Sequence, residues 1–188
     1  MNERVTLLIA VVTLVVGLVV VFLAWNAKRK RSARLRARFG PEYERLLAET
    51  GSQLKAEEIL REREERSRRI IVRPLPVGDR EHFAQAWRTV QARFVDDPGQ
   101  AVIEADRLLE QLMAQRGYPT GDFEQQASDV SVDHPRVVQD YRAAHVIAEQ
   151  QRQGHASTED LREALIHYRA LYEELLSPSL TIANEVKK

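Results

Sequence analysis

The pattern of hydrophobic and polar positions begins with one long apolar stretch near the N-terminus. Residues 5–25 contain no charged side chain and have the length that a helix needs to cross the hydrocarbon core of a bilayer. The pattern predicts a transmembrane helix, with residues 1–27 as a membrane anchor. A cleaved signal peptide is the alternative, but its apolar region is shorter and follows its positive charges. Here the basic residues come after the apolar stretch, which favours the anchor.

The second feature is a basic segment directly after the apolar stretch. By the positive-inside rule it predicts a single-pass protein with its short N-terminus outside and its C-terminal part in the cytoplasm. The same side chains are candidates for contact with anionic lipid headgroups, although they could equally set the topology alone. The basic residues are Lys28, Arg29, Lys30, Arg31, Arg34, Arg36 and Arg38.

Residues 28–77 are predicted to form this juxtamembrane segment and charged stalk helices. Glu and Arg recur four residues apart in residues 52–72, in the order that stabilises a solvated helix. The apolar positions there are too few for sustained heptads, so a coiled-coil dimer is not favoured and a homo-oligomer is left open. Pro74 and Pro76 cannot continue the helix and mark a domain boundary.

Amphipathic helical segments fill residues 78–178. Apolar side chains recur at steps of three and four, as in Phe83, Trp87, Val90 and Phe94, and no alternation of strand period occurs. Short connections containing glycine favour antiparallel neighbours. The pattern predicts a compact antiparallel bundle of about four main helices, and residues 179–188 are predicted to form a flexible tail. The expected fold class is therefore all-α.

Charge is distributed unevenly along the chain. Residues after Arg38 hold 20 of the 28 Lys and Arg residues but 27 of the 28 Asp and Glu residues, a formal charge of about −7. An acidic domain is a poor partner for nucleic acid, whose phosphates require clustered basic side chains. The chain contains no cysteine, which excludes disulfides and thiolate metal sites.

Histidines offer the only candidate chemistry. His145 and His167 lie on consecutive predicted helices and could meet across the helical hairpin, as weak candidates for a metal or acid–base site. A histidine beside an apolar stripe is more often a hydrogen-bonded core-edge residue. The chain has no glycine-rich phosphate loop, paired-histidine zinc helix, nucleophile elbow or kinase motif. We therefore expect no catalytic site and no cofactor.

Three segments carry a resemblance. They are FGPEYERLL from Phe39, RFVDDPGQAV from Arg93, and residues 131–176, which begin SVDHPRVVQDYRAAH. Together these segments resemble an uncharacterised family of bacterial single-span membrane proteins with a cytoplasmic helical domain. The resemblance implies a location at the bacterial inner membrane and one cytoplasmic helical unit, and it brings no activity.

These observations predict a membrane-anchored cytoplasmic interaction protein of the adaptor or scaffold kind. The lipid bilayer and its anionic headgroups are the expected partners of the anchor, and a cytoplasmic protein is the expected partner of the bundle. Anchoring would raise the local concentration of that protein at the membrane. The alternative is a metal-binding sensor or enzyme that uses His145 and His167.

Overall fold

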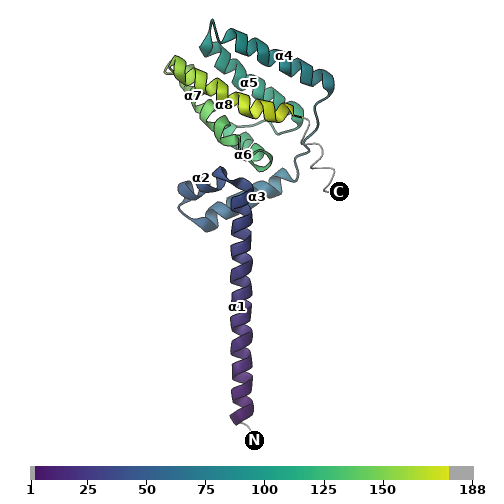
Figure 1. Ribbon diagram of the computed structural model, residues 1–188, viewed down its shortest axis with the longest axis vertical. Coiled ribbons are helices and arrows are strands. Elements are labelled where there is room, and N and C mark those ends of the chain that lie inside the picture. Colours follow the sequence, from purple (N-terminus) through teal and green to yellow (C-terminus); the bar gives the residue numbers. More distant parts are fainter. Residues whose placement is uncertain (1–2, 178–188) are drawn as a thin grey trace. The chain divides into compact units, whose positions relative to one another are not determined.

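A computed structural model describes the backbone of residues 3–177 and the side chains of residues 13–23 and 25–177. The described backbone contains eight α-helices and no strand, which confirms the all-α expectation (Figure 1). The chain divides into two compact units, residues 1–38 and residues 39–188. The predicted flexible tail lies outside the described residues.

Helix α1 (Glu3–Phe39) carries the predicted membrane span. The described part of the chain contains no helix that is both long and apolar enough to cross a membrane. This finding contradicts the prediction of a single transmembrane helix. The apolar run within the described side chains, residues 13–23 and Trp25, is shorter than the roughly 20 residues that a span requires. Residues 5–12, which begin the predicted span, lie outside the described side chains.

Helices α2 (Pro41–Thr50) and α3 (Gln53–Ser67) form a short antiparallel pair at the start of the second unit. Gly40 has a positive φ of 48°, a conformation that glycine adopts without steric cost, and Pro41 follows at the first helical position. The next turn uses Gly51, with a φ of 60°. This turn lets α3 pack back against α2.

Helix α3 corrects the expectation of a solvated stalk. Its sequence is mostly charged, but Ala56, Leu60 and the charged residues Glu57 and Arg63 are buried. Charged residues on a helix predict solvent exposure only when they have no partner on another helix. Here Arg63 pairs with a carboxylate on α2, so the helix packs as part of the second unit.

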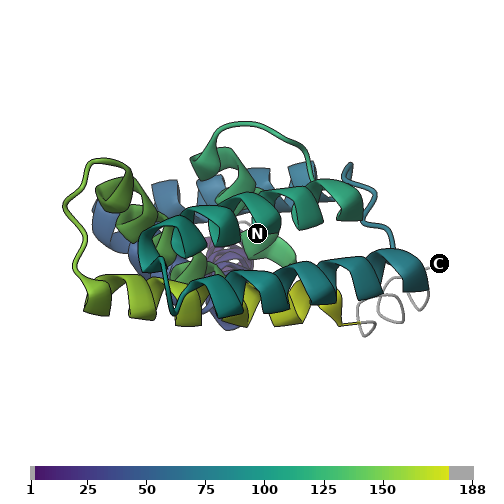
Figure 2. The same cartoon turned by 90° about the horizontal axis from the view of Figure 1, so that it is seen from above.

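Five further helices form the bundle: α4 (Val77–Arg93), α5 (Pro98–Arg116), α6 (Phe123–Asp133), α7 (Val138–Arg152) and α8 (Thr158–Leu176). Helix α8 packs against both α7 and α5, and α5 packs against α4 (Figure 2). The side chain of Asp97 accepts a hydrogen bond from the amide of Gln100 and caps α5. A capping box between Ser157 and Asp160 starts α8.

The core of the bundle is apolar and aromatic. Phe83, Trp87 and Val90 of α4 are buried, and Phe94 is partly buried, in agreement with the predicted stripe. The Trp87 ring stacks on Tyr172 of α8, with 4.5 Å between ring centroids and 20° between ring planes. This stack joins the first and last helices of the bundle.

Replacing Trp87 with alanine should therefore destabilise the protein strongly. The change removes a large buried ring and leaves a cavity against Tyr172, at an expected cost of about 3–5 kcal/mol in the free energy of unfolding. Urea unfolding of a fragment covering residues 39–188 measures this cost. Arg88→Ala, at an exposed position of the same helix, should change the free energy of unfolding by less than about 0.5 kcal/mol. Equal losses in the two variants would contradict the core assignment.

Candidate functional site

The carboxylate of Glu42 in α2 has no solvent exposure and is surrounded by arginines. Arg45 donates two hydrogen bonds of 3.0 Å, from Nε to Oε1 and from Nη2 to Oε2. Arg63 of α3 donates from Nη1 to Oε2 at 2.8 Å, and Arg142 of α7 donates from Nε to Oε1 at 3.2 Å. Gln139 of α7 donates from Nε2 to Oε1 at 2.5 Å. One carboxylate therefore joins three helices.

A wider network balances the charge around Glu42. Burial alone would raise the pKa of the Glu42 carboxyl, but hydrogen bonds from Arg45 and Arg63 and the charge of Arg142 outweigh burial and lower it. Three arginines meet three carboxylates in this network: Arg45, Arg63 and Arg142 with Glu42, Glu49 and Glu124. Such a network holds the helices together.

A second buried carboxylate, Asp106 of α5, joins α5, α7 and α8. Tyr168 of α8 donates its hydroxyl to Oδ1 at 2.7 Å. His145 of α7 places Nδ1 3.3 Å from the same oxygen, and Arg152 of α7 donates from Nη2 to Oδ2 at 2.6 Å. Burial opposes ionisation, but the hydrogen bonds from His145, Tyr168 and Arg152 prevail and lower the pKa of Asp106.

Aromatic rings enclose the His145 side of this cluster. The imidazole stacks on Phe123, with ring centroids 3.6 Å apart and 4° between the planes. Its other nitrogen, Nε2, lies 3.9 Å from Oε1 of Glu149. Tyr141 is fully buried beside Phe123 and Tyr168, and burial raises the pKa of its hydroxyl above the usual value. The imidazole therefore has a partner at each nitrogen and on one ring face.

The third buried polar group lies where α6 ends. His134 is almost fully buried, and its Nδ1 lies 3.5 Å from Oε1 of Glu174 without hydrogen-bond geometry. Burial lowers the pKa of this histidine, so the ring is neutral at pH 7. Nearby, Arg116 donates from Nη1 to the carbonyl of Leu175 at 3.0 Å, and Tyr118 donates its hydroxyl to Asp133 at 3.3 Å. These contacts fasten the ends of α5, α6 and α8 together.

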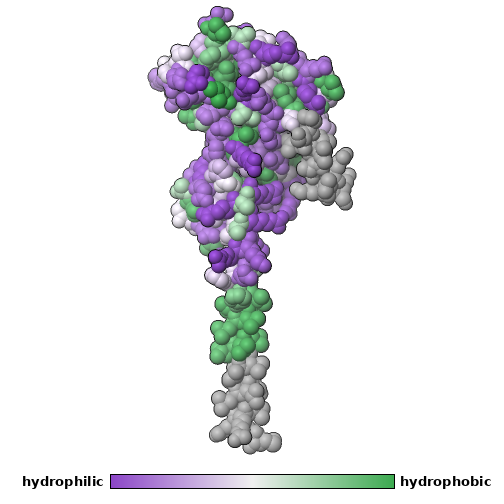
Figure 3. Space-filling view, viewed as in Figure 1, coloured by the Kyte–Doolittle hydropathy of each residue, from purple (hydrophilic) through white to green (hydrophobic). Residues whose placement is uncertain are grey.

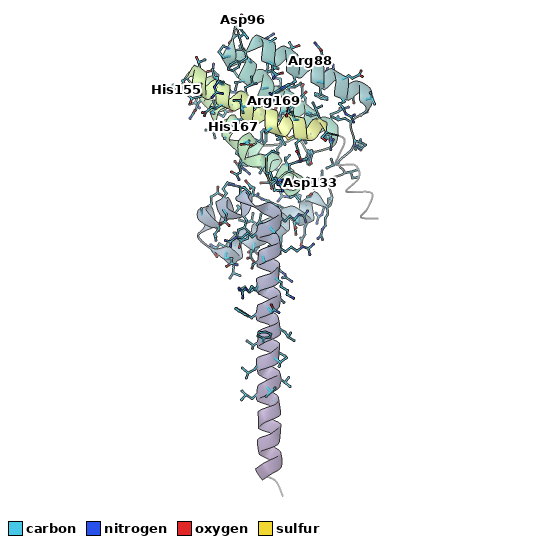
Figure 4. The ribbon with its side chains drawn as sticks, viewed as in Figure 1. Arg88, Asp96, Asp133, His155, His167 and Arg169 are labelled. Atoms are coloured by element: carbon cyan, nitrogen blue, oxygen red, sulfur yellow. The ribbon has the colours of Figure 1, made fainter. Side chains whose placement is uncertain are left out.

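The structure does not combine His145 and His167 into one site. His145 pairs with Asp106, whereas Nδ1 of His167 lies 3.0 Å from Oδ1 of Asp140. Figure 4 marks His167 on α8 and Asp133 at the end of α6. Among the residues whose side chains are described, no group of three or more His, Cys, Asp or Glu could hold a metal ion. The weak metal candidates therefore belong to separate ion pairs.

The sequence analysis missed Asp106 and Glu42, although the sequence contains a signal for each. Asp106 stands four residues after Val102 and three before Leu109, so it lies on the apolar stripe of α5. Glu42 stands four residues before Leu46, on the buried face of α2. An acidic residue in register with a core stripe indicates a buried partner on another helix.

The predicted lipid-contact residues lie in the C-terminal part of α1. Lys28, Arg29, Lys30 and Arg31 are exposed, and the guanidinium of Arg29 lies 5.5 Å from the centroid of the Trp25 ring. A cation over an indole ring is a favourable pairing. Arg34, Arg36 and Arg38 follow within the same helix.

Removing the Asp106 carboxylate should destabilise the bundle. Asp106→Ala leaves Tyr168 without its acceptor and separates His145 from its partner, at an expected cost of about 3–5 kcal/mol at pH 7. Glu110→Ala, one turn later on an exposed position of the same helix, is the matched control and should cost much less.

The loss of stability caused by Asp106→Ala should become smaller as the pH falls. The folded-state pKa of Asp106 lies below its unfolded-state value, so the carboxylate stabilises the fold above about pH 4 and loses this effect as the pH falls through the folded-state pKa. Chemical unfolding of the wild type and of Asp106→Ala from pH 7 down to pH 3 measures the difference between their free energies of unfolding. A gap between wild type and Asp106→Ala that widens in acid would contradict this assignment.

Replacing both His145 and His167 with glutamine tests the metal alternative. Because the two rings belong to separate ion pairs, zinc titration followed by calorimetry should show no one-to-one site that the double substitution removes. Tight stoichiometric binding that disappears in the variant would reinstate the sensor or enzyme alternative.

No protein-family model matches the chain, and neither the curated proteins nor the solved structures contain a significant match to it. The resemblance to a family of bacterial membrane proteins therefore stays a prediction.

Proposed function

We propose that the chain is a non-catalytic interaction protein that works at a lipid membrane. One observation carries this proposal: in the middle part of α1 the described large apolar side chains are exposed on every side of the helix. Between Leu14 and Trp25 the large apolar side chains have exposed fractions of 49–67%. In Figure 3 they form a hydrophobic band that hydrophilic residues follow. A contiguous apolar surface of this kind marks contact with a membrane or another protein.

The residues next to this band favour lipid as the contact. Trp25 ends the apolar run, and tryptophan is enriched at membrane–water interfaces. The basic residues from Lys28 follow directly, where anionic headgroups would attract them. An apolar surface next to basic side chains favours contact with anionic lipid, through burial of apolar area and through charge.

The second unit supports an interaction role better than a catalytic one. Its buried carboxylates are occupied by arginine, histidine and tyrosine partners within the fold. These contacts stabilise a folded surface and leave the groups without a reactive proton or an open coordination position. Attachment of α1 to lipid would then concentrate a protein partner at the membrane. Negative surface potential is a property of the cytoplasmic leaflet, so the basic segment favours a cytoplasmic location for this unit.

Vesicle flotation of the full chain tests the lipid contact. We expect more of the protein to float with vesicles of phosphatidylcholine and phosphatidylglycerol than with vesicles of phosphatidylcholine alone. Each basic residue near an anionic surface contributes on the order of 1 kcal/mol. Replacing Lys28, Arg29, Lys30 and Arg31 together with glutamate should therefore reduce partitioning to the anionic vesicles at least about tenfold.

A matched control reverses four exposed basic residues of the second unit: Lys55, Arg68, Arg69 and Arg73. This variant has the same net charge as the first, so nonspecific repulsion from anionic vesicles is equal in both. The control should keep most of the anionic preference. Equal losses in the two variants, or no preference for anionic vesicles in the wild type, would refute the assignment of the basic segment to headgroup contact.

A further inference from the structure

Helices α2 and α3, which we call the cap, meet the rest of the second unit through polar side chains. Glu42 of the cap bonds to Arg142 and Gln139 of α7. Arg63 of the cap lies 3.4 Å from the hydroxyl of Ser131 on α6. A further contact joins Arg66 Nε and Asp129 Oδ1 at 4.0 Å.

The cap has its own small apolar core. Its buried apolar side chains lie outside the main core cluster, which begins at Leu75: Tyr43, Leu46, Ala56 and Leu60. A buried hydrogen bond of 3.2 Å from the Tyr43 hydroxyl to Glu57 joins α2 to α3. The two helices are therefore held to each other by apolar packing and a hydrogen bond, and ion pairs and hydrogen bonds join them to α6 and α7.

Non-helical backbone connects the cap at both ends. Gly40, with its positive φ, separates it from α1. Residues 68–76 separate it from α4, and the amide of Arg73 donates a 2.7 Å hydrogen bond to the carbonyl of Arg116 at the end of α5. This bond anchors the connection on the bundle side. Backbone rotations at these two junctions could move the cap without breaking a helix.

We propose that the cap is a releasable element that Glu42 locks onto α7. The buried carboxylate holds Arg63 and Arg142 together across the interface. Without its charge Arg63 loses its carboxylate partner, Arg142 keeps only Glu124, and the two guanidinium groups stay close together in a buried site. Loss of this one charge then separates the cap from the bundle while each keeps its own core. The lock gives the proposed interaction protein two states, which differ in whether the facing sides of α6 and α7 are covered.

Two pairs of spin labels on the full chain test this proposal. The chain has no cysteine, so labels can be placed without removing native residues. The first pair, Glu58→Cys on α3 and Gln150→Cys on α7, reports the distance from cap to bundle. The second pair, Arg107→Cys on α5 and Gln150→Cys, reports distances within the bundle. All three positions are exposed.

Glu42→Gln, which removes the charge and keeps the shape, is introduced into each labelled protein in detergent micelles. We expect the distance distribution of the first pair to broaden toward longer distances and that of the second pair to stay unchanged. Glu49→Gln removes an exposed carboxylate that also pairs with Arg45, and it should alter neither distribution. An unchanged first pair would overturn the proposal. Equal broadening of both pairs would also overturn it, because the cap would then be an inseparable part of the bundle.

Discussion

A carboxylate that is removed from water must be compensated by partners inside the protein, and this constraint acts on Glu42. Its desolvation opposes ionisation, and three arginines reverse that effect. Those arginines come from α2, α3 and α7. The positions of α2 and α3 on α7 therefore depend on pairing the Glu42 carboxylate with these arginines. Asp106 imposes the same requirement on α5, α7 and α8 inside the bundle. The arrangement of helices is fixed by these two groups as well as by apolar packing.

The two units of the chain follow different physical rules. In the second unit, apolar side chains are buried and most charges near the core have partners of opposite sign. In α1 the large apolar side chains between Leu14 and Trp25 are exposed, and a basic segment follows them. The first arrangement stabilises a folded surface, whereas the second leaves apolar area that a further contact would cover. The proposed function assigns that contact to lipid.

Sequence periodicity predicted the helices of the bundle well, because local rules determine them. The stripe containing Trp87 is buried, and the caps at Asp97 and Ser157 form as their sequences indicate. Part of α3 is buried where the sequence predicts a solvated helix, because Arg63 pairs with Glu42, which lies 21 residues away on another helix. Pairing between distant residues is invisible to periodicity. Periodicity also does not show that His145 and His167 belong to different ion pairs. His145 pairs with Asp106, and His167 pairs with Asp140.

Hydrogen exchange of the full chain, resolved by residue, tests most directly whether charge pairing attaches the cap more weakly than apolar packing holds the bundle. Exchange in increasing denaturant gives a free energy of opening for each protected amide. The account predicts one shared value for amides of α2 and α3 and a distinctly higher shared value for α5, α7 and α8. A single value common to all five helices would contradict it, because the second unit would then open only as a whole.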